Sequence, residues 1–202
     1  MSRHQVHYCI SGFTQHQGRN NGVLKLSELL INAGFADGSR SRVYLHPWKA
    51  QWQTIAEHAF LLGSLYDRQL VVGIYAYSWG AGHGAIRLAS ELGERGIAVE
   101  QMVLCDPVPR PWLPWRWTAM LPASLGRSIK VPGNVRMVRS LNQRKNLPQG
   151  HDVVARSDKT VVVPPFRLYC THQYADDATR FHNVALTAAR EVAQSAGHRD
   201  GN

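Results

Sequence analysis

Short apolar runs alternate with longer amphipathic stretches along most of this chain. The runs, which we interpret as strands, lie at 6–10, 42–46, 71–76, 101–105, 134–139 and 166–170. Between them, apolar residues recur at helical spacing and predict helices at about 23–31, 49–62, 79–92 and 177–196. Strands that alternate with helices form a parallel sheet covered on both faces. The pattern therefore predicts a three-layer α/β/α fold with a mostly parallel sheet of about six strands, and ligands at the carboxyl ends of those strands.

One segment breaks this alternation, at about 107–133. It holds six prolines and three tryptophans among arginines. The chain carries a net charge of +9, and its basic surplus is concentrated in a wider stretch that includes this segment: residues 106–150 hold eight Lys or Arg residues against Asp106 alone. We interpret the segment as a lid-like insertion that suits an acyl group, an anionic membrane surface or a partner protein. A packed surface lobe with solvated arginines is the simpler alternative.

The totals indicate one globular domain, 1–202, with this insertion. Hydrophobic residues make up 44% of the chain, and no run approaches the roughly 18 apolar residues of a membrane span. The first residues lead directly into a strand without a secretory segment, so we expect a cytoplasmic protein. Cys9, Cys105 and Cys170 lack metal-ligand spacing and are expected to be buried. The sequence implies neither a cofactor nor a metal, and it leaves the oligomeric state open.

A serine lies at the sharpest predicted turn, between the strand 71–76 and the helix that follows. Small residues, Ala76 and Gly80, stand two positions before and after Ser78, where strand and helix backbones pass close together. This stretch resembles the nucleophile elbow of the α/β-hydrolase family, Gly-x-Ser-x-Gly, with Ala76 in place of the first glycine. The alternative is a plain serine turn in a nucleotide-binding type of sheet. The resemblance implies a small member of the family, similar to cutinase-like or small thioesterase-like proteins.

A serine nucleophile needs a base and an orienting acid, which the family places in the order Ser, acid, His. Asp106 follows the next strand and is the expected acid, because the more usual position, one strand later, offers no acidic residue between 140 and 143. Asp152 is the fallback, and an Asp that merely caps a turn is the alternative. His172 directly follows the last strand and is the favoured base. His182 takes that role if the last helix begins at Asn183.

The resemblance also implies two oxyanion-hole donors, the backbone N–H groups of Phe13 and Trp79. The expected activity is that of a serine hydrolase, which cleaves a small-molecule carboxylic ester or thioester through an acyl-enzyme on Ser78. The alternative is a catalytically silent binding module whose basic, Trp-rich insertion contacts an anionic membrane, nucleic acid or a protein. Nucleic acid is disfavoured because no recognised nucleic-acid motif accompanies the charge.

Overall fold

A parallel sheet forms the centre of the computed structural model, which describes residues 3–13, 15, 21–38, 40–65, 69–109 and 128–197. Within these residues the central sheet has seven strands, and every pair in it is parallel. Their order is β2 (Ser41–His46), β1 (Arg3–Ile10), β3 (Gln69–Tyr77), β4 (Val99–Cys105), β6 (Val135–Gln143) and β8 (Val161–Val162), with β9 (Phe166–Leu168) also pairing with β6. The predicted mostly parallel sheet is confirmed, and β8 is an addition to it.

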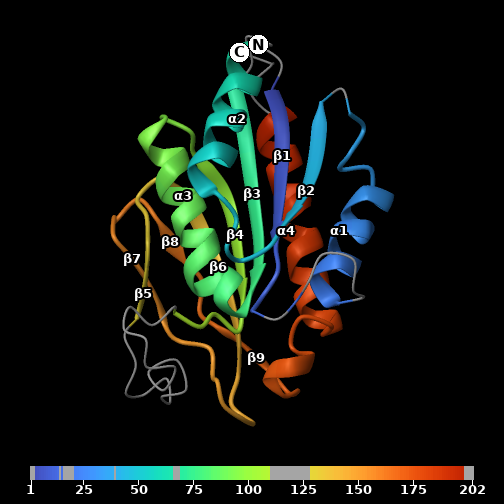
Figure 1. Cartoon of the computed structure of the whole chain (residues 1–202), viewed down its shortest axis with the longest axis vertical. Coiled ribbons are helices and arrows are strands. Elements are labelled where there is room, and N and C mark those ends of the chain that lie inside the picture. Colours follow the sequence, from blue (N-terminus) through green and yellow to red (C-terminus); the bar gives the residue numbers. More distant parts are fainter. Residues whose placement is uncertain are drawn as a thin grey trace.

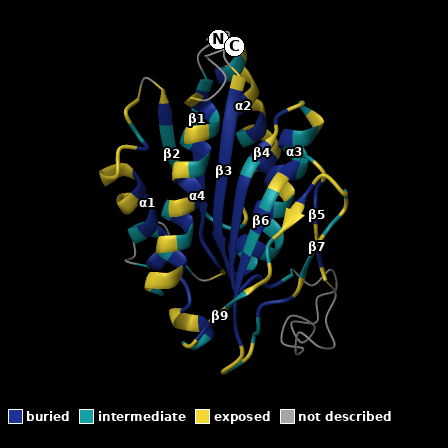
Figure 2. Cartoon of the chain, turned by 180° about the vertical axis from the view of Figure 1, so that it is seen from behind, coloured by how far each residue is buried: buried dark blue, intermediate teal, exposed yellow. Residues whose placement is uncertain are grey.

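Helices cover both faces of the sheet. Figure 1 shows α2 (Trp52–Leu65) and α3 (Ala85–Glu94) on one face, and Figure 2 shows α1 (Gly22–Asn32) and α4 (Thr179–Gly197) on the other. The apolar stripe of α3 that predicted this helix, residues 85, 88, 89 and 92, is fully buried against the sheet. The predicted three-layer α/β/α fold is therefore confirmed.

Two large apolar clusters form most of the core, one on each face of the sheet. On β3, Val72, Ile74 and Ala76 belong to the cluster under α2 and α3, whereas Tyr75 and Tyr77 belong to the cluster under α1 and α4. Every residue of β3 after Gln69 is buried. This two-sided burial explains why the strand reads as a continuous apolar run rather than an alternating one.

Several segments differ from the sequence-based expectation. Most of the predicted insertion, residues 110–127, lies outside the described residues. Its end forms β5 (Ile129–Val131), which pairs with β7 (Val153–Ala155) in a small parallel sheet that the sequence did not predict. A π-helical turn, η1 (Gly80–Gly84), precedes α3, and a 3-10 turn, η4 (His172–Tyr174), precedes α4. In the part of the chain described here, none of the helices combines the length and hydropathy needed to cross a membrane.

Candidate active site

Ser78 occupies a strained turn between β3 and η1. Its φ angle is 55°, in the left-handed region, and only 5% of the residue is exposed. Neighbouring backbones crowd this turn: a methyl group at Gly80 would lie 2.4 Å from the Ser11 carbonyl oxygen, and one at Gly82 would lie 2.1 Å from that of Val108. Ala76 is fully buried on the strand side. The small residues that marked this stretch are therefore required by close packing.

Asp106 follows β4 in a similar conformation, with a φ angle of 44° and no exposed surface. Its Oδ1 atom accepts two backbone hydrogen bonds, from Gln143 N at 3.1 Å and from Gly150 N at 2.7 Å. Gly150 cannot be larger, because a methyl group there would lie 2.5 Å from Asp106 Oδ1. These contacts fix the carboxylate and leave Oδ2 directed toward a third partner.

That partner is His172, in the turn η4. Its Nδ1 atom lies 2.6 Å from Asp106 Oδ2, and its Nε2 atom lies 2.9 Å from Ser78 Oγ. A carboxylate oxygen accepts, so Nδ1 carries the proton and Nε2 of the neutral ring presents its lone pair to the serine hydroxyl. Asn146 Oδ1 accepts from the His172 backbone N–H at 2.7 Å and holds the turn. The structure thus brings the three residues into one hydrogen-bonded chain.

Tyr77 also holds the histidine in place, and no pattern in the sequence pointed to this residue. Its hydroxyl donates to the His172 carbonyl oxygen at 2.6 Å, and the two rings lie 5.2 Å apart. Burial raises the pKa of Tyr77, and the nearby Asp176, Cys105 and Asp106 raise it further. The phenol therefore stays protonated and remains a donor.

The other candidates lie elsewhere. His182 lies in the first turn of α4, and its Nε2 atom is 3.0 Å from the Gly22 carbonyl oxygen. The Asp152 side chain is 70% exposed and lies 3.7 Å from Arg144. Cys105 donates its thiol to the Ala175 carbonyl oxygen at 3.2 Å, and burial, followed by the charge of Asp106, raises its pKa well above the ordinary value. None of these three groups contacts Ser78 within the described residues.

Phe13 and Trp79 flank Ser78. The loop after β1 touches the serine, since a methyl group at Gly12 would lie 3.0 Å from Ser78 Cβ. The rings of Phe13 and Trp79 are 4.3 Å apart, and Trp48 lies 5.7 Å and 5.1 Å from them. Phe13 is 43% exposed, and both tryptophans are half-buried. We call these three side chains the Phe13–Trp48–Trp79 cluster.

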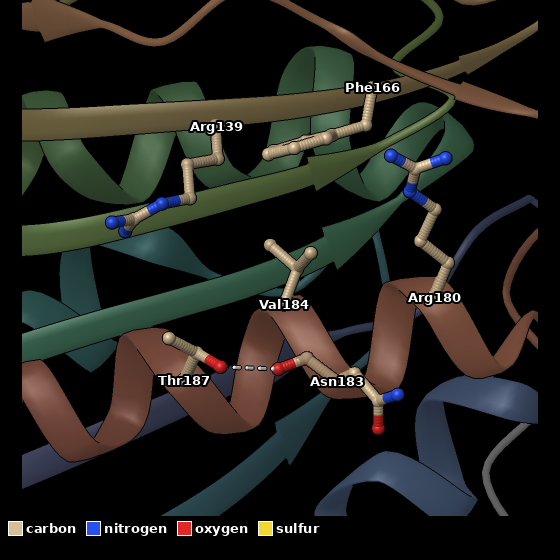
Figure 3. Close-up of a pocket in the computed structure, with 6 residues that line it drawn as sticks. All are labelled: Arg139, Phe166, Arg180, Asn183, Val184 and Thr187. Carbon is tan, nitrogen blue, oxygen red and sulfur yellow. Dashed lines mark hydrogen bonds between the residues drawn. The ribbon is translucent and has the colours of Figure 1, made fainter.

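A separate groove of about 400 Å³ lies between α4 and the strands β6 and β9, and Figure 3 shows its lining residues: Arg139, Phe166, Arg180, Asn183, Val184 and Thr187. Both arginines already have partners. Arg139 pairs with both carboxylate oxygens of Glu191 at 2.9 and 3.0 Å, and Arg180 lies 5.2 Å from the centre of the Phe166 ring. The groove shares no residue with the Ser78–His172–Asp106 chain.

In the described ranges, no group of three or more His, Cys, Asp or Glu side chains is arranged to hold a metal ion. No protein-family model matches the chain, and a comparison with curated proteins gives no match.

Solved structures similar to this chain include ClbQ from the colibactin NRPS/PKS pathway, at 10% identity and a TM-score of 0.47, over 96% of this chain and 98% of that one. RedJ with a PEG molecule bound in its active site is similar at 9% identity and a TM-score of 0.45, over 93% of this chain and 92% of that one. At these scores, the chemistry of the site has to be interpreted from its own geometry.

Proposed function

We propose that this protein is a serine hydrolase that cleaves a carboxylic ester or thioester through an acyl-enzyme on Ser78. The observation that carries the proposal is the hydrogen-bonded chain from Ser78 Oγ through His172 to Asp106 Oδ2, with distances of 2.9 and 2.6 Å. A nucleophile, a base and a group that orients the base, each within hydrogen-bond reach, are what acyl transfer at neutral pH requires.

In the acylation step, Ser78 Oγ attacks the acyl carbon while His172 Nε2 takes the hydroxyl proton. The imidazolium that forms is stabilised by Asp106, whose carboxylate is fixed by the N–H groups of Gln143 and Gly150. The same proton then passes to the leaving alcohol or thiol as its bond to the acyl carbon breaks. Water then attacks the acyl carbon while His172 Nε2 takes a proton from it, and this proton passes to Ser78 Oγ as the bond between Oγ and the acyl carbon breaks, which releases a carboxylic acid and restores Ser78.

The negative charge of the tetrahedral intermediate needs fixed donors. We assign this role to the backbone N–H groups of Phe13 and Trp79. Trp79 directly follows the nucleophile, and the loop that carries Phe13 touches Ser78 through Gly12. Donors of this kind commonly contribute about 100- to 1000-fold each to kcat.

The Phe13–Trp48–Trp79 cluster supports a substrate with an apolar acyl group. Its three rings pack beside the nucleophile, and Phe13 is 43% exposed. Aromatic faces of this kind bind hydrocarbon and leave polar groups in water. The alternative function, a silent binding module, depends on the basic insertion, and most of that segment lies outside the described residues.

Labelling with a fluorophosphonate tests the proposal. We expect the wild-type protein to become labelled and to hydrolyse p-nitrophenyl butyrate, and Ser78→Ala to do neither. Ser27→Ala is the matched control, since Ser27 is also 5% exposed but belongs to α1, where its hydroxyl donates to Leu24 O. Equal labelling and turnover in wild type and Ser78→Ala would overturn the proposal.

A further inference from the structure

One glutamine joins the two loops on either side of Ser78. Gln15 Oε1 accepts from the Gly12 N–H at 2.9 Å, and its Nε2 donates to Asp176 Oδ2 at 2.5 Å. Gly12 belongs to the loop after β1, whereas Asp176 follows the turn η4 that contains His172. The side chain therefore connects the loop of a proposed oxyanion donor with the loop of the proposed base.

Asp176 is a rigid anchor for this connection. The residue is 2% exposed, and its Oδ2 atom also accepts from the Gly22 N–H at 2.8 Å, at the start of α1. Gly22 packs directly on the Asp176 backbone, since a methyl group on this glycine would lie 2.1 Å from the Asp176 carbonyl carbon. A buried carboxylate with two donors holds its geometry well, because losing either donor leaves charge unpaired.

The two ends of Gln15 cannot exchange places. If its amide were reversed, the carbonyl oxygen would face the Asp176 carboxylate and the NH2 group would face the Gly12 N–H, so both contacts would be repulsive. The bridge therefore has one orientation, and it fixes the direction of the Gly12 N–H.

The direction of the Gly12 N–H bears on which backbone N–H of this loop is left to bind an oxyanion. The Ser11 N–H donates to His46 O at 2.9 Å, and the Gly12 N–H is used by Gln15. Among the described residues, the Phe13 N–H has no acceptor. Gly12 also lies against Ser78 Cβ. Fixing the peptide between Ser11 and Gly12 therefore also restrains the next peptide, which carries the Phe13 N–H.

We propose that Gln15 and Asp176 are positioning residues of the hydrolase, which hold the Phe13 N–H where the oxyanion forms. The inference rests on the proposed function. It assigns a role to two residues that touch neither Ser78 nor the substrate, and it explains why a buried aspartate lies four residues beyond His172.

The test separates positioning from stability by comparing turnover with the binding of a transition-state analogue. Gln15→Met keeps the length of the side chain but removes both hydrogen bonds. We expect kcat for p-nitrophenyl butyrate to fall about 10- to 100-fold with KM nearly unchanged. Inhibition by butylboronic acid, which forms a tetrahedral adduct with a serine, should weaken by a similar factor. A purely structural role would lower the melting temperature and the fraction of active protein without this parallel loss.

A change of charge at the two ends of the bridge, residues 15 and 176, provides the second measurement. Gln15→Glu alone places two carboxylates together and should lose at least as much activity as Gln15→Met. Adding Asp176→Asn removes one of the two facing negative charges, so the double variant should recover part of the loss, but not all of it, because the same Asp176 oxygen also accepts from the Gly22 N–H. Lys25→Gln is the control, because Lys25 joins α1 to Asp177, the residue after Asp176, through an exposed ion pair at 2.6 Å and should keep wild-type kcat.

The outcomes are distinct. If wild-type protein is neither labelled by fluorophosphonate nor active, the proposed function fails. If wild type is labelled and active but Gln15→Met keeps its kcat and its boronic acid affinity, the positioning role is wrong while the proposed function stands. A double variant no better than Gln15→Glu would likewise contradict the bridge.

Discussion

Ser78 and Asp106 leave neighbouring parallel strands in the same left-handed conformation, with φ angles of 55° and 44°. Each directly follows a residue of one pair, Tyr77 and Cys105, in the register of β3 and β4. For a residue with a side chain, this conformation costs about 1–2 kcal/mol. Two such residues, side by side at the carboxyl ends of β3 and β4, indicate that the backbone is strained where both side chains turn toward His172.

This strain predicts an unusual order of stability at position 78. Ser78→Gly and Ser78→Ala should both be inactive, yet the glycine variant should be the more stable by about 1 kcal/mol, because glycine adopts this φ freely. At ordinary positions, alanine is the more stable of the two. Urea unfolding of both variants gives the comparison, and a more stable alanine variant would show that the turn is unstrained.

Asp106 is expected to contribute far more to turnover than any other nearby acid. Asp106→Asn keeps the shape of the side chain but favours the wrong histidine tautomer, so kcat should fall about 1000- to 10,000-fold. Asp152→Asn, at a 70% exposed side chain, is the matched control and should stay close to wild type. Steady-state kinetics of the two variants show which aspartate supports turnover. An equal loss of kcat in both would contradict the assignment of Asp106 as the acid.

The two histidines should separate activity from stability. His172→Gln is expected to abolish turnover, because no other base contacts Ser78 among the described residues. His182→Gln should keep kcat and lose about 1 kcal/mol of stability, since His182 donates to Gly22 O at 3.0 Å. Turnover and thermal unfolding of both variants test this. A large fall in kcat for His182→Gln would assign the base to His182 instead.

The arrangement of the long elements could be predicted because it depends on local patterns. Each of the six predicted strands overlaps an observed strand, and the apolar stripes of the four predicted helices correspond to α1, α2, α3 and α4. Chain order also pointed to Ser78, Asp106 and His172, which lie within hydrogen-bond distance of one another. Their roles in catalysis remain predictions.

Contacts between distant segments left no local signal. Strands β5, β7 and β8 have two or three residues each, too few to show a period. Tyr77 lies one residue beyond the predicted strand 71–76, and its bond to His172 O spans 95 positions. Gly150 lay in a polar, turn-rich stretch, and its need to be glycine arises from Asp106, 44 positions away. Such residues are determined by tertiary packing.

Backbone packing at the serine turn leaves no room for a side chain at Gly80. A methyl group there would meet two backbone oxygens, Ser11 O at 2.4 Å and Ile10 O at 2.8 Å, neither of which can move without shifting β1. Gly80→Ala should therefore destabilise the protein by about 1–3 kcal/mol. Gly197→Ala, at the exposed end of α4 with nothing within 4 Å, should be neutral or slightly stabilising. Thermal unfolding of both variants provides the measurement, and equal midpoints would contradict the close packing.

His7 predicts how stability depends on pH. The residue is fully buried on β1, with Nδ1 2.9 Å from the Tyr75 hydroxyl, and burial lowers the pKa of His7 from 6.5 to about 3. As the pH falls, His7 therefore becomes protonated near pH 6.5 in the unfolded chain but only near pH 3 in the folded protein. The stability from this group is fully present above pH 6.5 and is lost progressively as the pH falls toward 3.

Between pH 7 and pH 5, this single group should lower the free energy of unfolding by about 2 kcal/mol. His7→Phe should remove that part of the pH dependence, whatever its effect on stability at pH 7. Tyr75→Phe is the matched control, because it removes the hydroxyl but keeps the buried histidine, so the slope should remain. Urea unfolding at both pH values compares the three proteins. If His7→Phe loses as much stability on acidification as wild type, another group causes the dependence.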